Sequence, residues 1–526
     1  MTEILKFKLQ EMTFVKTSGC FFARIAMCAV VLVGLLSPYC YSGYSTPGNG
    51  RVWNLDSLVS NSQGSVTFSG GSYFLNDTLT ISQSDTVRII SDFILKMRSQ
   101  VFIDIFGVLI IDPPVQGVIT AADTTLKFLG LKFEDQSDGS FMKKTVFEYG
   151  NGIRMLDCNI TVESCIIRFN TLNSAFSSSA ISLFRSNSVI SNCTIYRNRR
   201  AAISSGANIT SSPVITGNRI FENNTENANV PQINLGASAS DTLIIRNNII
   251  RGLYDNCGGI SLLPVGSIPI ALIEGNVIAG NRYGIAVGGG NSFVIIRNNR
   301  IDSNNIQGLP NLGGSGINFN GSATQVCIVT GNTIRNNLWG ITIQGTAKPN
   351  MGNLSNAVTL DDGYNVIYDN GNSGRIYDLF NNTPDSIKAE NNWWNTYNQD
   401  TIEAHIFHRA DSSALGFVDY IPIWPITSAG PNTTITGELP DSPEISAYPN
   451  PFNPEVSFRI SFPKDGFAEL KLYGISGKET AILFSGYASR GNMTVKFNSA
   501  ELSAGVYLYR LSYGRSLVTG RIVLIK

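Results

Sequence analysis

Few residues in this chain belong to the types that commonly carry out catalysis. Histidine occurs only twice in 526 residues, at His405 and His408, with Glu403 close by in the sequence. A spacing of three residues in a helix can place two metal ligands on one helix face. No second ligand pair accompanies these residues, so a surface or packing role is favoured over a metal site. Ser-His-Asp and Cys-His machinery is equally unsupported.

Carboxylates offer no clearer sign of catalysis. Enzymes that cleave polysaccharides usually need a pair of carboxylates, or basic side chains beside a Ca²⁺ site made of Asp. No such pair stands out in this sequence. Arg246, Glu274 and Arg297 each stand two residues before a residue of the repeat described below. Their alternating charge is typical of a surface ion-pair strip, which contributes little stability.

Two aromatic residues give a hint of sugar binding. Tyr283 and Trp339 each precede a Gly, and each follows a repeated Asn by seven positions. In stacked strands with one strand between them, the two side chains would lie ~10 Å apart. Planar faces at that separation suit alternate sugars of a polysaccharide chain. Packing at a corner of the fold is the alternative interpretation.

The elements that must position these residues follow from a phrase repeated nine times between Val162 and Trp394. Each copy has a polar ladder residue, then an Ile or Trp two positions later, and most copies have a further Asn three positions after that. The copies are spaced by roughly 23 to 33 residues, the size of one stacked supersecondary unit. The ladder residues are Cys165, Cys193, Asn218, Asn248, Asn276, Asn299, Asn332, Asn365 and Asn392.

These short runs are rich in Ile, Val and Thr and alternate with a period of two, which indicates strands. Asn tolerates left-handed backbone conformations, so the ladder Asn is expected to mark a corner of each coil. Further strands follow in most coils, as at Gly284-Ile285-Ala286. The pattern predicts an all-β protein, a right-handed single-stranded parallel β-helix. It resembles the parallel β-helix repeat family of the pectate-lyase-like superfold over roughly 79–423, a likeness that implies fold more than activity.

The N-terminus has the pattern of an export signal. Basic residues precede the apolar run Ile25–Leu36, so 1–45 is predicted to be a signal peptide with an extended basic region. The run is too short to span a bilayer, and no transmembrane span is expected in the mature chain. Residues 46–78 are predicted to form an N-terminal cap on a β-helix occupying 79–426. Cys165 and Cys193 are expected to be adjacent, either as free inward thiols or as a disulfide.

A separate module follows the solenoid. Residues 427–443 are rich in Thr, Gly, Pro and Ser and are predicted to be a linker. Short alternating strands in 444–526 predict a small immunoglobulin-like β-sandwich. The module closely resembles the C-terminal type A sorting domain of the type IX secretion system, which implies that it is an address for export through the outer membrane. The motif residues that carry the resemblance are Pro449, Asn450, Pro451, Phe452, Asn453, Pro454, Gly505, Val506 and Tyr507.

Taken together, these features predict a secreted or cell-surface β-helix that binds extracellular or surface polysaccharide. Lysine and arginine total 39 against 39 acidic residues, so nucleic acid is not an expected partner. The expected partners are the type IX secretion machinery, through 444–526, and a polysaccharide. The chain is expected to be a monomer with no cofactor, although Ca²⁺ stays open. The alternatives are a polysaccharide lyase or glycoside hydrolase, and a structural or adhesive surface protein without a small ligand.

Overall fold

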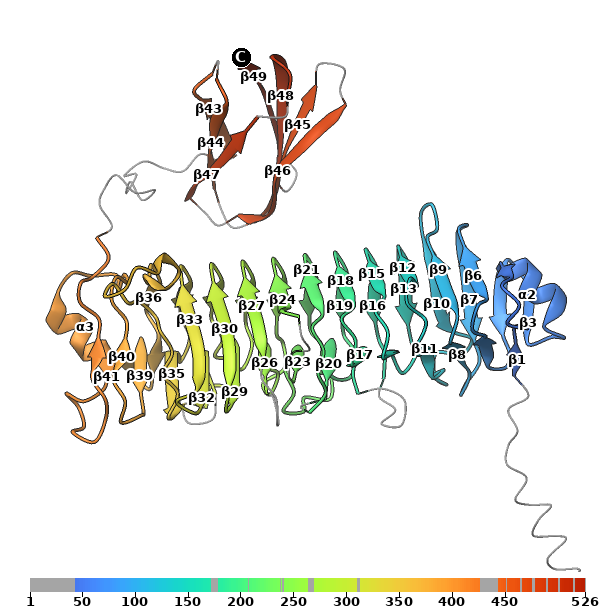
Figure 1. Cartoon of the computed structure of the whole chain (residues 1–526), viewed down its shortest axis with the longest axis horizontal. Helices are drawn as coiled ribbons and strands as arrows, with labels where there is room; N and C mark the ends of the chain where they lie inside the picture. The colour runs from blue at the N-terminus through green and yellow to red at the C-terminus, as the bar shows by residue number, and fades with distance from the viewer. Residues whose placement is uncertain are drawn as a thin grey trace, which may run out of the picture.

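A computed structural model describes residues 43–525 apart from 172–177, 207, 237, 239–240, 264–268, 310–312, 426–442, 451, 464–465, 475–477, 489–490, 500–501 and 514–515. Nearly all of the predicted signal peptide and linker therefore lies outside the described residues. From Tyr44 onward the chain winds into a rod of stacked coils that follow one another in sequence order (Figure 1). Within the described part of the chain, no helix is long and apolar enough to cross a membrane.

Three sheets run along the rod, and a typical coil contributes one strand to each of them. Neighbouring strands pair in parallel, except for the antiparallel pair β3–β4 in the first coil. This arrangement is the right-handed parallel β-helix that the sequence predicts.

We call the three sheets A, B and C. Sheet A contains β1 (Tyr44–Ser45), β5 (Leu79–Ile81), β8 (Phe102–Ile105), β11 (Gly130–Phe133), β14 (Ile153–Leu156), β17 (Ile181–Phe184), β20 (Ile203–Ser205), β23 (Ile233–Leu235), β26 (Ile260–Leu262), β29 (Ile285–Gly289), β32 (Ser315–Gly321), β35 (Trp339–Gly345), β39 (Leu379–Asn381) and β41 (Ile406–Phe407). Sheet B contains β2 (Val52–Trp53), β6 (Thr86–Ile89), β9 (Val108–Ile111), β12 (Phe141–Lys143), β15 (Thr161–Glu163), β18 (Val189–Ser191), β21 (Val214–Thr216), β24 (Leu243–Arg246), β27 (Ile270–Glu274), β30 (Ser292–Arg297) and β33 (Gln325–Thr330). Sheet C contains β3 (Val66–Ser69), β4 (Ser72–Leu75), β7 (Phe93–Met97), β10 (Gly117–Ala121), β13 (Thr145–Glu148), β16 (Ile166–Arg168), β19 (Thr194–Tyr196), β22 (Arg219–Phe221), β25 (Ile249–Arg251), β28 (Val277–Ala279), β31 (Arg300–Asp302), β34 (Thr333–Arg335) and β36 (Val366–Tyr368).

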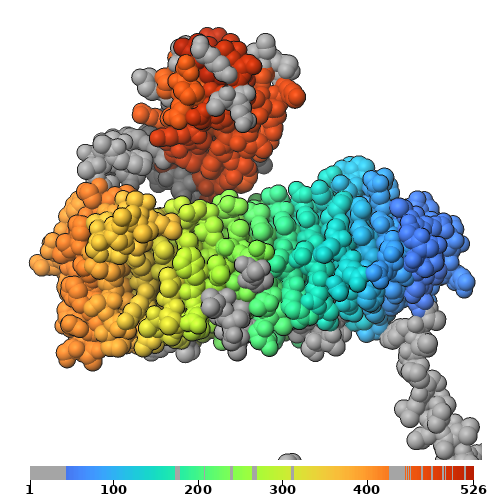
Figure 2. All heavy atoms as spheres, viewed as in Figure 1, coloured from blue at the N-terminus to red at the C-terminus, as the bar shows by residue number. Residues whose placement is uncertain are grey.

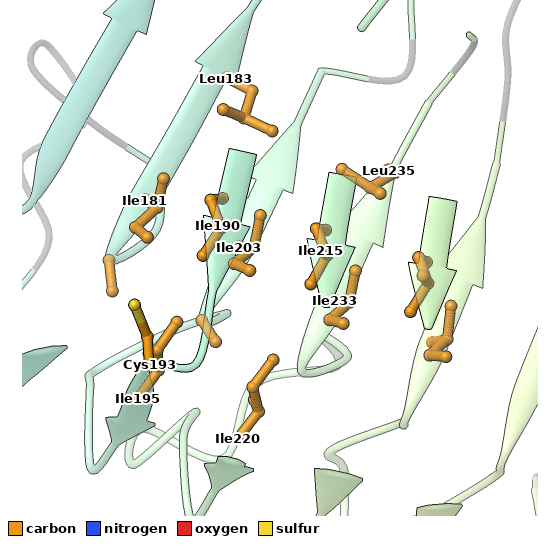
Figure 3. Packing of buried hydrophobic residues seen from close by; sticks show 14 of the residues in the cluster. Ile181, Leu183, Ile190, Cys193, Ile195, Ile203, Ile215, Ile220, Ile233 and Leu235 are labelled. Atoms are coloured by element: carbon orange, nitrogen blue, oxygen red, sulfur yellow. The ribbon is translucent and has the colours of Figure 1, made fainter. Parts of the chain in front are cut away.

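The core is a column of aliphatic side chains from all three sheets. In the short strands of sheet C the middle residue points inward, and the Ile residues at that position pair directly, as Ile195 does with Ile220. Figure 3 shows how Ile residues from the three sheets converge on the interior. These side chains are fully buried. Since each coil buries its own Ile set against the next, burial of apolar surface stabilises the stack coil by coil.

The ladder residues form a buried chain of hydrogen bonds along the rod. The side-chain oxygen of Asn299 accepts from both the backbone N–H and the side-chain amide of Asn276, each at 2.9 Å. The Asn276 amide also donates to the carbonyl of Ile245 at 2.9 Å. The same pattern repeats from Asn218 to Asn392, and the Cys193 N–H donates to Asn218 at its start. The ladder thereby supplies partners for polar groups that are sealed from water.

The corner itself lies one residue earlier than predicted. The residue before each ladder position has a positive φ, between 54° and 67°, whereas the ladder residue continues into the next strand. The nine residues with this conformation are Ser164, Asn192, Gly217, Asn247, Gly275, Asn298, Gly331, Tyr364 and Asn391. The ladder Asn is therefore needed for the hydrogen bonds of its side-chain amide, and not because it tolerates a left-handed backbone conformation.

A second ladder runs through the later Asn of each repeat, and a Gln repairs its one gap. Asn223 donates to the Gln232 side-chain oxygen at 2.9 Å, and the Gln232 amide donates to the carbonyl of Arg251 at 2.9 Å. Gln232 thus occupies the place of the Asn that is missing at the exposed Leu253. The repair is incomplete, because the buried side-chain oxygen of Asn281 in the next coil has no hydrogen-bond partner.

Both ends of the rod are covered by short helices. Helix α2 (Leu55–Asn61) begins at a capping box in which Asn54 accepts from the Ser57 N–H at 2.8 Å, and it buries Leu55 and Leu58. The predicted cap, 46–78, also contributes coil strands, so stacking already begins at β1. At the other end, α3 (Gln399–His405) follows the last Asn of the ladder. The 3₁₀ turn η1 (Thr359–Asp361) and the small pair β37–β38 (Gly371–Asn372, Arg375–Ile376) precede it, and the small pair β40–β42 joins a strand before it to one after it (Ile387–Lys388, Val418–Asp419).

The C-terminal module is a small antiparallel β-domain with its own buried core. One sheet contains β43 (Glu444–Tyr448), β44 (Glu455–Phe462) and β47 (Gly491–Asn498). The other contains β46 (Glu479–Ala488), β45 (Gly466–Gly474), β48 (Gly505–Tyr513) and β49 (Ser516–Leu524). Phe458 and Leu470, from different sheets, belong to one apolar cluster, as a sandwich requires.

The ladder makes a direct prediction about stability. Asn276→Ala leaves the Asn248 N–H and the Ile245 carbonyl without their side-chain partners inside the core. We expect a loss of about 3 kcal/mol in the free energy of unfolding. The matched control is Asn320→Ala, at an exposed position of β32, which should cost under about 0.5 kcal/mol. Equal losses measured by chemical denaturation would contradict a structural role for the ladder.

Candidate functional site

A groove of about 640 Å³ lies on the outer face of sheet A. Along this face the outward residues of successive strands align in register. The row reads Ser204, Asn234, Ser261, Ala286, Asn318, Thr342 and Phe380. Small and polar side chains occupy most of the row, and the large Phe380 stands at its C-terminal end.

The structure brings both predicted sugar-binding residues, Tyr283 and Trp339, to the wall of this groove. They occupy equivalent positions with one coil between them, and that coil carries the small residue Ser315, which pairs with Trp339. The Tyr283 ring leans over Gly258, where a Cβ would collide with it. The space between the two aromatic side chains therefore exists because Ser315 does not fill it.

Trp339 is one member of an aromatic cluster at the C-terminal end of the groove. Its ring stacks on Tyr377 with centroids 4.8 Å apart, and it meets the edge of Phe380 at 4.9 Å. Phe380 in turn stacks on Phe407 at 4.6 Å. The sequence left two roles open for Trp339, packing at a corner or contact with a sugar. In the structure Trp339 packs against other aromatic rings and also lines the groove.

Amides and hydroxyls, with the guanidinium group of Arg282, supply the polar part of the lining. The Asn318 amide donates to the Thr342 hydroxyl at 2.6 Å, which fixes its orientation. Arg282 donates to Gln307 at 2.8 Å and also to Asn229, so it links three coils at the groove edge. Gln344 is exposed at the far end of the groove. Such groups can hydrogen-bond the hydroxyls of a sugar without changing charge.

The groove lacks the acid pair that glycoside hydrolysis needs. Among the described residues that line it there is no Asp or Glu, and the neighbouring stretches 264–268 and 310–312 contain none in their sequence. Burial raises the pKa of Tyr283 to about 12, so its hydroxyl stays protonated at neutral pH. Tyr283 can donate a hydrogen bond there but is a poor general base.

The two histidines have structural surroundings. Helix α3 ends at His405, so His405 and His408 do not lie on one helix face, the arrangement that a metal site at this spacing would need. His408 is fully buried, its Nδ1 accepts from the Val418 N–H at 2.9 Å, and its Nε2 lies 2.7 Å from Glu403. In the described part of the chain, no three His, Cys, Asp or Glu side chains form a group that could hold a metal ion. The expectation that no cofactor is required stays a prediction.

The five cysteines in the described part of the chain are buried free thiols. In the structure the Cys165 N–H points at the Cys193 sulfur, 3.4 Å away, and no disulfide joins them. Burial raises the pKa of Cys257 and of Cys327 to about 12. Thiols with such pKa values contain almost no thiolate at neutral pH and are poor nucleophiles.

The predicted sorting motif connects the start of the C-terminal domain to its last strand. Phe452 is buried and its N–H donates to the Val523 carbonyl, while the Asn450 amide donates to the Arg521 carbonyl at 2.9 Å. Pro449 is exposed before this contact, Pro451 lies outside the described residues, and Asn453 and Pro454 lead into β44. Gly505, Val506 and Tyr507 open β48, where the Tyr507 hydroxyl donates to the Ser503 carbonyl.

Comparison with known proteins identifies both parts of the chain. Residues 128–270 match the right-handed β-helix region family, and residues 446–526 match the secretion system C-terminal sorting domain. The chain is therefore a right-handed β-helix repeat protein. It ends in a type IX secretion sorting domain, which directs export to the cell surface or beyond it.

Two solved phage proteins have a distant likeness to this chain. One is a double mutant of the tailspike protein of E. coli bacteriophage HK620, with 12% identity and a TM-score of 0.32 over 95% of this chain and 88% of that one. The other is a tailspike protein from Acinetobacter baumannii bacteriophage Fri1, a capsular polysaccharide depolymerase, with 10% identity and a TM-score of 0.26 over 82% and 73%. Likeness at this level says nothing about the activity of this chain. None of the curated proteins matches the sequence.

The pKa of one carboxyl group of the solenoid, that of Asp302, is strongly shifted, and the side chains around it hold the coils together. Asp302 on sheet C accepts from Ser303, Asn336 and Arg335 at 2.8, 2.9 and 3.0 Å, and Arg300 lies 3.0 Å away. Burial opposes the charge, but these hydrogen bonds and the guanidinium groups outweigh it and lower the pKa of Asp302 to about 2. A carboxyl with that pKa stays ionised and cannot serve as a general acid.

Asp302→Asn should therefore destabilise the protein in a pH-dependent way. A carboxyl whose pKa is lowered by folding stabilises the native state above its unfolded pKa, near 3.9, and loses that contribution as the pH falls towards 2. We expect the wild type to exceed Asp302→Asn by about 2 kcal/mol at pH 7, with a smaller difference at pH 2.5. Unfolding curves across this range measure it, with Glu222→Gln, in the more exposed pair with Arg197, as the control. A difference that does not change with pH would contradict the assignment.

Proposed function

We propose that this protein is exported to the cell surface or beyond and binds polysaccharide in the groove on sheet A. The observation that carries the proposal is the composition of that groove. Tyr283 and Trp339 face a space opened by Ser315, and amides and hydroxyls line the rest. Aromatic faces and neutral hydrogen-bonding groups are what the two surfaces of a sugar ring require. The groove crosses several coils, which suits a chain of sugars rather than a single one.

Binding without cleavage is the form of the proposal that the groove supports. Hydrolysis of a glycosidic bond needs an acid and a second carboxylate about 5 to 10 Å apart. The described lining has neither, and its only titrating hydroxyl is held protonated. A polysaccharide lyase or glycoside hydrolase is therefore the weaker candidate. A purely structural or adhesive protein would have no need of a groove lined by aromatic and hydrogen-bonding side chains.

Variants of the groove test the binding. Ala286→Trp fills the centre of the outward row and should abolish retention on a polysaccharide array, since it removes the space rather than a contact. Trp339→Ala should weaken binding about tenfold by removing one aromatic face. Phe68→Ala removes an aromatic that is 53% exposed at the far end of the rod and serves as the matched control. Thermal unfolding checks that each variant is folded.

The same array separates the rival functions. New reducing or unsaturated ends in the wild-type reaction would contradict binding without catalysis. If the wild type neither retains polysaccharide nor forms products, the structural alternative is supported. If Ala286→Trp and wild type are retained equally, the binding surface lies elsewhere and the assignment of the binding site to this groove is wrong.

Export depends on the C-terminal domain. Deleting 444–526 should leave the solenoid in the periplasm, because the address for the outer membrane is lost while the signal for the inner membrane stays. Cell fractionation and surface labelling with an antibody to the β-helix measure the outcome. Asn450→Ala, which removes two contacts with the last strand, should reduce export more mildly. Normal surface display of the deletion variant would refute the assigned role.

A further inference from the structure

The outer face of sheet B differs from the other two faces of the rod. Its central outward row is apolar over nine consecutive coils, with one Thr as the only hydroxyl-bearing member. These side chains are partly exposed rather than buried. The row reads Ile110, Phe141, Thr161, Val189, Val214, Ile244, Leu272, Ile295 and Ile328. Beside it, Phe293 and Val326 are 43% and 49% exposed.

The contrast with the other sheets argues that this row is not a by-product of the fold. Sheet A presents mainly Ser, Asn and Thr at its outward row, and the outward rows of sheet C mix Ile, Val and Phe with Arg, Tyr, Thr and Asp. All three sheets must bury apolar side chains on their inner side, so the core does not explain a difference between their outer faces. A monomeric protein seldom leaves so long an apolar row in contact with water, because its exposure forgoes the stabilisation that burial would give.

A row of charges flanks the apolar row on the same strands. It contains Lys143, Glu163, Ser191, Thr216, Arg246, Glu274, Arg297 and Thr330 in the order of the coils. Within one chain Lys143 lies 3.2 Å from Glu163, and Arg297 lies 2.7 Å from Glu274. The charged residues thus alternate in sign along the row, with a cation near each end.

We propose that the outer face of sheet B docks a second copy of this chain, with the two rods antiparallel. A two-fold axis along the strand direction, passing between the coils of Val214 and Ile244, lays the apolar row of one copy on that of the other. The same operation places Glu163 of each copy opposite Arg297 of the other, and it leaves the two Arg246 side chains one coil apart across the axis. An isologous contact of this kind is the common way for soluble proteins to dimerise.

Length and area favour this occupant over a small ligand or a compact domain. Nine strands at ~4.8 Å span roughly 40 Å. The strands of this strip are three to six residues long, so it is roughly 10 to 20 Å wide and covers about 400 to 800 Å² per partner, the size of a small to standard interface. The partner must present an equally long and flat apolar strip, and the same face of another copy does so. This dimer would replace the monomer expected from the sequence and would leave the groove on sheet A open.

Sedimentation of the exported chain tests the proposal. The wild type should be a dimer at about 10 µM, and Leu272→Lys should weaken association at least about 100-fold by placing a cation in the apolar strip. Ile249→Lys introduces the same charge at a partly exposed Ile on sheet C and should leave the dimer intact. A wild type that sediments as a monomer at 100 µM overturns the proposal. Altered hydrogen exchange of 444–525 in a monomeric Leu272→Lys would instead assign the strip to the chain's own sorting domain, which also overturns it.

Cross-linking tests the antiparallel arrangement separately. Val214→Cys lies next to the proposed axis and should cross-link between copies with a short bis-maleimide. Phe141→Cys at the end of the strip should not, because its counterpart lies ~34 Å away, seven coils along the rod. The five native Cys in the described residues are buried and should react slowly. Equal cross-linking of both variants would mean parallel rods and would overturn the antiparallel geometry.

Discussion

The solenoid depends on hydrogen bonds that pass from coil to coil inside it. Each coil must turn sharply after a strand, and the turn leaves backbone groups facing the apolar interior. Asn meets this need because one amide donates to a carbonyl and to the next Asn, while its oxygen accepts two N–H groups from the coil before, as Asn276 and Asn299 show. An unpaired group there would cost free energy in every coil. The same constraint keeps the Ile columns in register.

This constraint explains why the fold was readable from the sequence and the site was not. In most coils an Ile follows the ladder residue by two positions and a second Asn follows it by five. This fixed spacing indicates the strands from the local sequence alone. Gln232 and Asp378 do the work of ladder residues from outside the repeated phrase, which no count of spacings finds. The corner was misplaced by one residue, since Asn is frequent in both roles.

Groove residues could be predicted from the sequence only where they lie at a fixed offset from a ladder residue. Tyr283 and Trp339 follow the ladder by a constant seven positions, so their alignment could be predicted. Phe380 and Asn234 reach the groove after segments of irregular length, and their positions depend on the three-dimensional register of sheet A. The packing of Trp339 on Tyr377 also joins residues of two different coils, which periodicity cannot reveal.

Because the interior is committed to stacking, the three outer faces are free to differ, and they do. Sheet A has small and polar residues with aromatic walls, which suit a sugar chain, whereas sheet B has an apolar row, which suits another protein surface. The two requirements do not compete, since each coil contributes separate residues to each face. An exported solenoid can thus present a binding groove outward while a different face holds a partner. The outer faces can take different roles because each coil has three strands, and only the inner sides of these strands contribute to the shared core.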